Sequence, residues 1–182
     1  MNQTIRIIGG KYRSKKISFP ALDDLRPTPD RVRETLFNWL RHDIRTATCL
    51  DLFAGSGALG FEAFSRGAQT VTFVECSPVV CTSLKKQTQA FQSTQLNVIQ
   101  TDATVFLAQT PLSFDIIFFD PPFSSFTHVE HLLKQPIANV LHPEGLLYLE
   151  SPHSILLDEK IWKPLQQKQT GRVFYSLYRK RS

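Results

Sequence analysis

The sequence has few cysteines and no long hydrophobic run, and each shortage excludes a class of protein. Three cysteines occur among 182 residues, and no two of them form a C-x-x-C pair. The sequence therefore favours neither a disulfide framework nor a zinc site, and we expect no bound metal. No apolar run approaches the roughly 18 residues that cross a bilayer, and the patch Ile5–Ile8 is too short for the core of a signal peptide. We therefore expect a cytoplasmic protein without membrane contact.

Positive charge is concentrated at one end of the chain. The net charge is +5, and the first 45 residues hold ten basic and five acidic side chains, whereas the two signs balance over the remainder. Localised positive charge suits a surface that binds a polyanion, because each Lys or Arg that neutralises a phosphate releases counterions. A solvated surface explains the same excess, and charge alone does not separate these two interpretations.

The first 45 residues predict a hairpin followed by a helix. Residues Ile5–Phe19 alternate in polarity around a pair of glycines, which is typical of a short hairpin. Thr28 can cap a helix that has Pro29 at its first position, and apolar residues then recur at helical spacing. We therefore expect a basic N-terminal extension over residues 1–45.

From residue 46 onward, short apolar runs alternate with amphipathic segments over the length of one ordinary domain. This spacing predicts right-handed crossovers and a largely parallel sheet with helices on both faces. Two last runs flank Thr170-Gly171 with no room for a helix, so they predict an antiparallel hairpin. We expect an α/β domain over residues 46–182 with a mostly parallel seven-stranded sheet. The predicted strands are Thr48–Phe53, Thr70–Glu75, Leu96–Thr101, Phe114–Asp120, Gly145–Glu150, Leu165–Gln169 and Arg172–Tyr178, and the predicted helices are Pro29–Arg41, Ala58–Arg66, Pro78–Ala90, Ala103–Ala108 and Thr127–Leu141.

A glycine-rich turn follows the first strand of this domain. Gly55, Gly57 and Gly60 fit G-x-G-x-x-G, and Glu75 lies twenty residues after Gly55, so a dinucleotide fingerprint is formally met. Such glycines let a ligand approach the helix N-terminus, while a carboxylate at the next strand end accepts hydrogen bonds from ribose hydroxyls. Taken alone, the motif favours an NAD-dependent oxidoreductase.

Acidic residues at the strand ends favour a different cofactor. Asp51 lies just before the glycine turn, where it would repel a pyrophosphate but attract the sulfonium and ammonium groups of S-adenosylmethionine. Asp102 ends the third strand, where its carboxylate can accept from an adenine amino group while the N–H of Ala103 meets a ring nitrogen. An ordinary role as a helix cap or turn residue explains any one of Asp51, Glu75 and Asp102. It explains less well why all three occur together with the glycine turn.

The fourth strand ends in the tetrapeptide Asp120-Pro121-Pro122-Phe123. Two prolines fix the backbone and remove two N–H donors, so carbonyls and the Asp120 carboxylate can converge as acceptors on one point. The exocyclic amine of a nucleobase is a poor nucleophile, and acceptors on its N–H bonds would aim its lone pair at a methyl carbon. Phe123 would stack on the base. The tetrapeptide therefore predicts methylation of an amino group on a base.

These motifs resemble those of class I, Rossmann-like S-adenosylmethionine-dependent methyltransferases of the amino-methylating group, whose fourth-strand motif is [DNS]-P-P-[YFW]. Within that group the chain resembles the bacterial small-subunit ribosomal RNA guanine-N2 methyltransferases that modify guanine 966, in the family's nucleotide numbering. The most family-specific segments are RIIGGKYR at residues 6–13 and RPTPDRVRETLF at residues 26–37. Pro29 departs from the small polar residue expected there.

The resemblance implies a role for each matching position. Asp51 and Gly55 would border the methionine portion of the cofactor, Glu75 the ribose and Asp102 the adenine, and residues 120–123 would contact the target guanine. The implied partner is 16S rRNA in the small ribosomal subunit, bound by a monomer through its basic extension. The remaining candidates are Phe53, Ser56, Gly57 and Ala103 for the cofactor, and Arg6, Lys11, Arg13, Lys15, Lys16, Arg26 and Arg31 for RNA.

Three other functions stay open on the sequence. The nearest is the same chemistry at adenine N6 of DNA or another RNA. An NAD-dependent oxidoreductase belongs to a different class, and an RNA-binding module without catalysis is the third. Whether the protein retains S-adenosylmethionine or NAD would distinguish a methyltransferase from an oxidoreductase.

Overall fold

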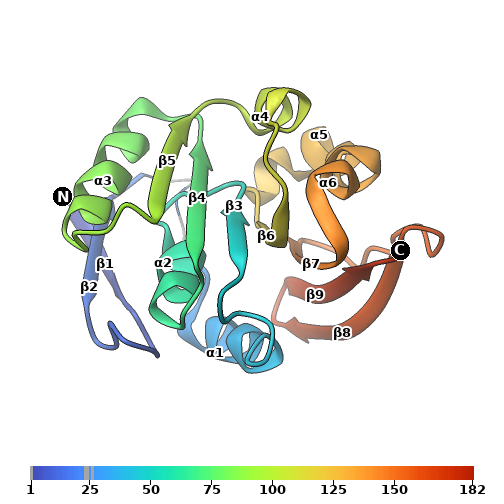
Figure 1. The fold of residues 1–182 in the computed structure, drawn as a ribbon, viewed down its shortest axis with the longest axis horizontal. Coiled ribbons are helices and arrows are strands. Elements are labelled where there is room, and N and C mark those ends of the chain that lie inside the picture. The colour runs from blue at the N-terminus through green and yellow to red at the C-terminus, as the bar shows by residue number, and fades with distance from the viewer. Residues whose placement is uncertain (1, 23–24, 26) are drawn as a thin grey trace.

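One seven-stranded sheet forms the centre of the protein (Figure 1). The computed structural model describes residues 2–22, 25 and 27–182. The strands are β3 (Thr48–Asp51), β4 (Thr70–Glu75), β5 (Leu96–Gln100), β6 (Phe114–Phe119), β7 (Leu141–Ser151), β8 (Trp162–Thr170) and β9 (Val173–Lys180). Their order is β5-β4-β3-β6-β7-β9-β8. Strands β3 to β7 run parallel and β9 lies antiparallel between β7 and β8, which confirms the predicted sheet and its C-terminal hairpin.

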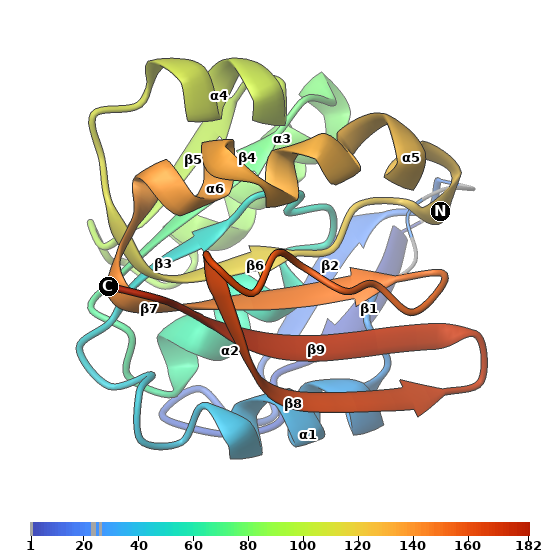
Figure 2. The same ribbon diagram turned by 90° about the vertical axis from the view of Figure 1, so that its right-hand side faces the viewer.

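Helices cover both faces of the sheet (Figure 2). One face carries α1 (Asp30–Trp39), α2 (Ala58–Ser65) and α3 (Pro78–Gln89), and the other carries α4 (Ala103–Gln109), α5 (Phe126–Val129) and α6 (Gln135–Val140). Short 3₁₀ turns, η1 (Phe123–Ser125) and η2 (Glu130–Leu133), adjoin α5. Among the described residues, none of these helices has the length and apolar character needed to cross a membrane.

The predicted single helix Thr127–Leu141 is wrong, because the structure divides this segment into α5, η2 and α6. Pro136 lies at the second position of α6. Proline has no N–H for the helical ladder and its ring clashes with the preceding turn, so a continuous helix cannot pass through it. Strand β7 also begins earlier than predicted, at Leu141 instead of Gly145.

Alternate residues of each strand enter two separate hydrophobic clusters, as the period of a strand requires. Cys49 and Ile116 pack on the side of α1 to α3, whereas Leu50 and Ile117 pack on the side of α4 to α6. Ile17 of the N-terminal extension is buried in the first cluster. The extension and the sheet therefore share one core.

The predicted N-terminal hairpin is confirmed as β1 (Asn2–Arg6) paired antiparallel with β2 (Lys16–Pro20). Its connecting turn docks on the last residue of α2, where the N–H of Lys11 donates to the Ser65 carbonyl at 2.7 Å. Gly10 has a φ of +77°, and a Cβ there would collide with that carbonyl. The glycine in this family-specific segment therefore permits close contact between the hairpin and α2.

A buried ion cluster attaches the extension to the domain. Arg33 of α1 and Glu62 of α2 have fully buried side chains, 3.5 Å apart at their closest polar atoms. Glu62 accepts from the N–H groups of Ile8 and Gly9 at 2.8 and 2.9 Å, and Arg33 donates to the Arg6 carbonyl at 3.1 Å. These contacts fix the hairpin, α1 and α2 relative to one another.

Replacing Glu62 by Ala should lower the free energy of unfolding by about 3–5 kcal/mol, because it removes the fully buried partner of Arg33 and leaves the exposed Asp30 carboxylate as its counter-charge. Asp30→Ala is the matched control, since the Asp30 side chain also pairs with Arg33 but is 72% exposed, and it should cost less than about 1 kcal/mol. Urea unfolding of both variants measures the difference. Equal losses would contradict the assignment of Glu62 as the anchor of the extension.

Candidate functional site

Three predicted acidic residues meet at the carboxyl edge of the sheet. β3 lies between β4 and β6. Asp51 and Glu75 end β3 and β4, and Asp120 directly follows β6, so the three acids lie where the strand order reverses, which is where such sheets bind ligands. Asp51 is 2% exposed. Burial raises its pKa well above the usual range, and the charges of Asp120 and Glu75 raise it further. The edge is therefore an acidic site that a cationic ligand would stabilise.

The glycine turn between β3 and α2 is held by two of these acids. The Asp51 carboxylate accepts from the N–H of Gly60 at 3.0 Å, and the Glu75 carboxylate accepts from the N–H of Gly55 at 3.0 Å. Gly57 precedes α2 with a φ of +75°. A Cβ on Gly57 would lie 2.5 Å from the Phe61 ring, so the protein itself requires glycine at this position.

Glu75 and Asp102 also support local backbone. Glu75 accepts a second hydrogen bond, from the Ser77 N–H at 2.8 Å. Asp102 is exposed and caps α4, since its Oδ1 accepts from the Thr104 N–H at 2.7 Å. A carboxylate accepts about four hydrogen bonds, so each side chain retains capacity for a ligand. Asp102 therefore has the ordinary role of a helix cap, which the sequence had left open. Its contact with adenine stays a prediction.

The other predicted cofactor residues line the same edge or support it. Phe53 is half-buried and meets Phe119 edge to face, with ring centroids 5.1 Å apart. Ser56 is buried, and its hydroxyl accepts from the Ala58 N–H at 3.3 Å. Ala103 is buried at the first position of α4. Ser56 therefore stabilises the turn, while Phe53 retains exposed surface for a ligand.

Asp120 is partly buried at the end of β6, and burial raises its pKa to about 6. Its Oδ2 accepts a 3.0 Å hydrogen bond from the Thr28 hydroxyl. The predicted N-cap role of Thr28 is wrong, because α1 starts after Pro29 with no side-chain cap. The Thr28 hydroxyl bonds to the distant Asp120 carboxylate instead of to a backbone N–H of α1.

Phe123, three residues beyond Asp120, is 40% exposed and free to stack on a planar ligand.

The sequence alone assigned Glu150 no role beyond the end of a predicted strand, and the structure places it beside Asp120. β6 and β7 pair in register, with Phe119 opposite Leu149, so Asp120 and Glu150 are the next residues along the two strands. Glu150 is 3% exposed and accepts from the Tyr148 hydroxyl at 2.8 Å. Burial raises the pKa of Glu150 well above its usual range, and the charge of Asp120 adds to the effect. Glu150 is recognised as a neighbour of Asp120 only from the register of β6 and β7, which the sequence does not specify.

The predicted RNA-binding residues occupy two parts of the surface. The hairpin turn packs against the C-terminal end of α2 (Figure 1), so its basic residues lie toward the amino edge of the sheet, away from Asp120. Lys15 donates to the Ala90 carbonyl at 3.1 Å and lies 4.6 Å from the Phe91 ring centroid, which gives it a structural contact. Arg31 is exposed in the first turn of α1, three residues after Thr28, and Arg26 lies outside the described residues. The other four, Arg6, Lys11, Arg13 and Lys16, are exposed on the hairpin.

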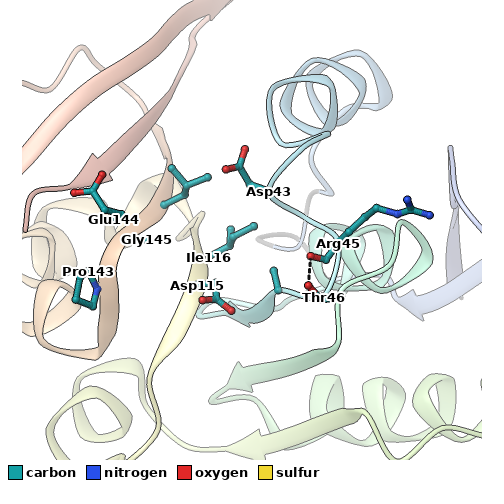
Figure 3. A pocket seen from close by; sticks show the side chains of 10 residues that line it. Asp43, Arg45, Thr46, Asp115, Ile116, Pro143, Glu144 and Gly145 are labelled. Carbon is teal, nitrogen blue, oxygen red and sulfur yellow. Dashed lines mark hydrogen bonds between the residues drawn. The ribbon is translucent and has the colours of Figure 1, made fainter.

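A pocket of about 290 Å³ opens at the amino edge of the sheet (Figure 3). Residues just before β3 and in the first halves of β6 and β7 line it, among them Arg45, Asp115 and Glu144, and none of the predicted site residues does. Across the part of the chain that the structure describes, no three His, Cys, Asp or Glu side chains gather as metal ligands would. The residues predicted to bind the cofactor and the base therefore lie at the carboxyl edge and not in this pocket.

Fold and site together define a Rossmann-like methyltransferase, with a glycine turn, acidic strand ends and an Asp-Pro-Pro-Phe segment at the strand-order reversal. The chain belongs to the family described as Conserved hypothetical protein 95, whose model matches residues 5–179. It is 43% identical to the Ribosomal RNA small subunit methyltransferase D of Haemophilus influenzae, over 96% of this chain and 93% of that protein. The corresponding protein of Escherichia coli K12 is 41% identical, over 97% and 90%.

Solved structures agree with this membership. The Escherichia coli protein yhhF has a TM-score of 0.85 and 40% identity, with 99% of each chain covered. A T. thermophilus 16S rRNA N2 G1207 methyltransferase shares the fold, with a TM-score of 0.71 and 24% identity over 100% of this chain and 50% of that chain. The resemblance inferred from the motifs is therefore confirmed.

Gly57→Ala should destabilise the protein even without a ligand, because it adds a clash with Phe61 to the strain of a positive φ. Gly171→Ala is the matched control, since Gly171 has a φ of +59° with no atom within 4 Å of an added Cβ. The control should lose only the strain of about 1–2 kcal/mol, and the clash should cost Gly57→Ala about 1–3 kcal/mol more. Urea unfolding measures both. A Gly57 variant as stable as the control would show that the ligand alone requires this glycine.

Proposed function

We propose that the protein transfers a methyl group from S-adenosylmethionine to the exocyclic N2 of a guanine in 16S rRNA, of the guanine 966 type. The observation that carries the proposal is the partly buried Asp120 acceptor beside the glycine turn, followed by two prolines and an exposed Phe123. The relatives named as small-subunit rRNA methyltransferases support the choice of substrate. They favour neither adenine N6 as the acceptor nor an NAD-dependent reaction.

The carboxyl edge fits the cofactor by its chemistry. Asp51 and Asp120 offer negative charge to a cationic ligand, and Gly55 and Gly57 add no side chains to the turn that leads into α2. Glu75 would accept from the ribose hydroxyls, and Asp102 with the N–H of Ala103 would hold the adenine. When bound there, S-adenosylmethionine supplies a methyl group attached to a positively charged sulfur, and that charge makes the sulfur a good leaving group.

Asp120 and the Pro121 carbonyl would each accept one N–H of the guanine amino group, and Phe123 would stack on the ring. These acceptors weaken the delocalisation of the nitrogen lone pair and align it for in-line attack, so alignment and electrostatics supply the catalysis. As the nitrogen–carbon bond forms and the sulfur–carbon bond breaks, the amine becomes cationic. Asp120, with a pKa of about 6, is ionised at neutral pH and can take the released proton.

Residues 1–45 would extend the methyltransferase domain of residues 46–182 toward the RNA. The exposed basic residues of the hairpin suit phosphate contacts distant from the reacting base, while Arg31 lies closer to it. Displacement from a sulfonium needs no Lewis acid, so the proposed reaction is metal-independent. We also propose that the enzyme acts as a monomer in the cytoplasm.

Asp120→Ala should reduce turnover by about two orders of magnitude or more, which is the usual effect of losing a preorganised electrostatic group. Affinity for S-adenosylmethionine should fall far less than turnover, because Asp51 still offers negative charge to the sulfonium. Turnover is measured with 16S rRNA and labelled cofactor, followed by nucleoside analysis, and affinity by calorimetry. Normal turnover in this variant would remove Asp120 from the mechanism.

Reversing Lys11, Arg13 and Lys16 to Glu should weaken binding to 16S rRNA and flatten its salt dependence by about one unit per lost phosphate contact. The matched control reverses Lys160, Lys163 and Lys168, which are exposed in and before β8. The control makes the same change of charge outside the extension and should retain the wild-type slope. If both triple variants give one slope, the charge of the extension serves solubility only.

A further inference from the structure

The Thr28 hydroxyl is the feature of the site that the proposed chemistry has not used. Thr28 is 6% exposed, and its hydroxyl donates to Asp120 Oδ2 at 3.0 Å, across a sequence separation of 92 residues. It lies two residues before α1, whose position is fixed by the buried contact between Arg33 and Glu62. The donor is therefore held in place from outside the sheet.

Within the described part of the chain, the other titratable groups that face Asp120 are two carboxyl groups and a phenol. Asp51 approaches from β3, and Tyr148 and Glu150 approach from β7. Burial raises the pKa of Asp120 to about 6, and the Thr28 hydrogen bond opposes that rise because it stabilises the ionised carboxylate. The same hydroxyl also opposes the rise in the pKa of Glu150, although its hydrogen bond goes to Asp120.

A protonated Asp120 would be a poor partner for an amine. Its hydroxyl would act as a donor, whereas the amino group of guanine needs acceptors for its N–H bonds. The carboxylate has two oxygens, and the Thr28 hydrogen bond uses Oδ2. A fixed donor on Oδ2 restricts rotation of the carboxylate and presents Oδ1 to the base.

We propose that Thr28 is a positioning residue for methyl transfer: it orients the Asp120 carboxylate and maintains it as the acceptor of the guanine amino group. This inference rests on the proposed function, because it assigns Thr28 a role through Asp120. It also gives the Arg-Pro-Thr segment of the extension a task at the reacting base, separate from RNA phosphate contacts.

The test compares Thr28→Val, which has nearly the same shape but no hydroxyl, with Thr28→Ser, which restores the hydroxyl. Turnover of 16S rRNA is followed across the pH range in which carboxyl groups titrate. Thr28→Val should lower kcat at neutral pH about ten-fold, the lower end of the effect of a hydrogen bond to a charged group. Its acidic limb should move to higher pH, since the pKa of Asp120 rises without the donor. Thr28→Ser should return both values toward wild type, and KM for S-adenosylmethionine should not change.

A wild-type pH profile in Thr28→Val would overturn the inference, as would a loss of kcat that is equal at every pH or that Thr28→Ser shares. If Thr28→Val unfolds, Thr28→Ala provides the same comparison without β-branching, and urea unfolding verifies its fold. Asp120→Ala, which removes the acceptor, separates the two levels of the argument. An Asp120→Ala enzyme with normal turnover refutes the proposed role of Asp120 in methyl transfer, whereas an inactive one combined with a normal Thr28→Val enzyme refutes only the role of Thr28.

Discussion

The site depends on carboxyl groups gathered at one poorly solvated edge of the sheet. Asp51, Glu75, Asp120 and Glu150 lie at the carboxyl ends of β3, β4, β6 and β7. The two most buried, Asp51 and Glu150, each have a pKa raised by burial and by a neighbouring acid. Such a cluster is costly to ionise without compensation. Backbone N–H groups and hydroxyls supply part of that compensation, and a cationic ligand would supply the rest. The same physical constraint thus accounts for the stability of the glycine turn and for the choice of cofactor.

The N-terminal extension is part of this arrangement and not an appendage to it. Its hairpin shares the core beneath α2, and the buried Arg33 joins it to Glu62. This anchoring fixes the start of α1 and hence the position of Thr28 on Asp120. Two positive charges of the extension, Arg33 and Lys15, have structural partners, so the charge available to a polyanion is smaller than the sequence total.

Much of the fold could be predicted from the sequence because its local patterns agree with the final structure. Apolar runs identified every strand of the large sheet, and Ser77, a residue type that favours this position, caps α3. The broken helix around Pro136 was predictable in principle, since proline cannot continue a helix. The glycine turn and the Asp-Pro-Pro-Phe segment combine a local motif with a strand end, which is why they could be located without coordinates.

Contacts set by tertiary packing could not be predicted in this way. Thr28 has the local chemistry of an N-cap, and only the folded chain shows that it bonds to Asp120 instead. Glu150 becomes a neighbour of Asp120 through the register of two strands. The partnership of Arg33 with Glu62 similarly requires two helices to be placed together, and no pattern along the sequence encodes that distance.

Proton release on cofactor binding tests the central claim most directly. If the raised carboxyl pKa values at this edge prepare it for a sulfonium, binding of S-adenosylmethionine near pH 6 should expel up to about half a proton from Asp120 alone. S-adenosylhomocysteine, which lacks the positive sulfur, should expel clearly less. Calorimetry in buffers of different ionisation enthalpy measures both values. Equal release for the two ligands, or none for either, would contradict an acidic edge built to bind a cation.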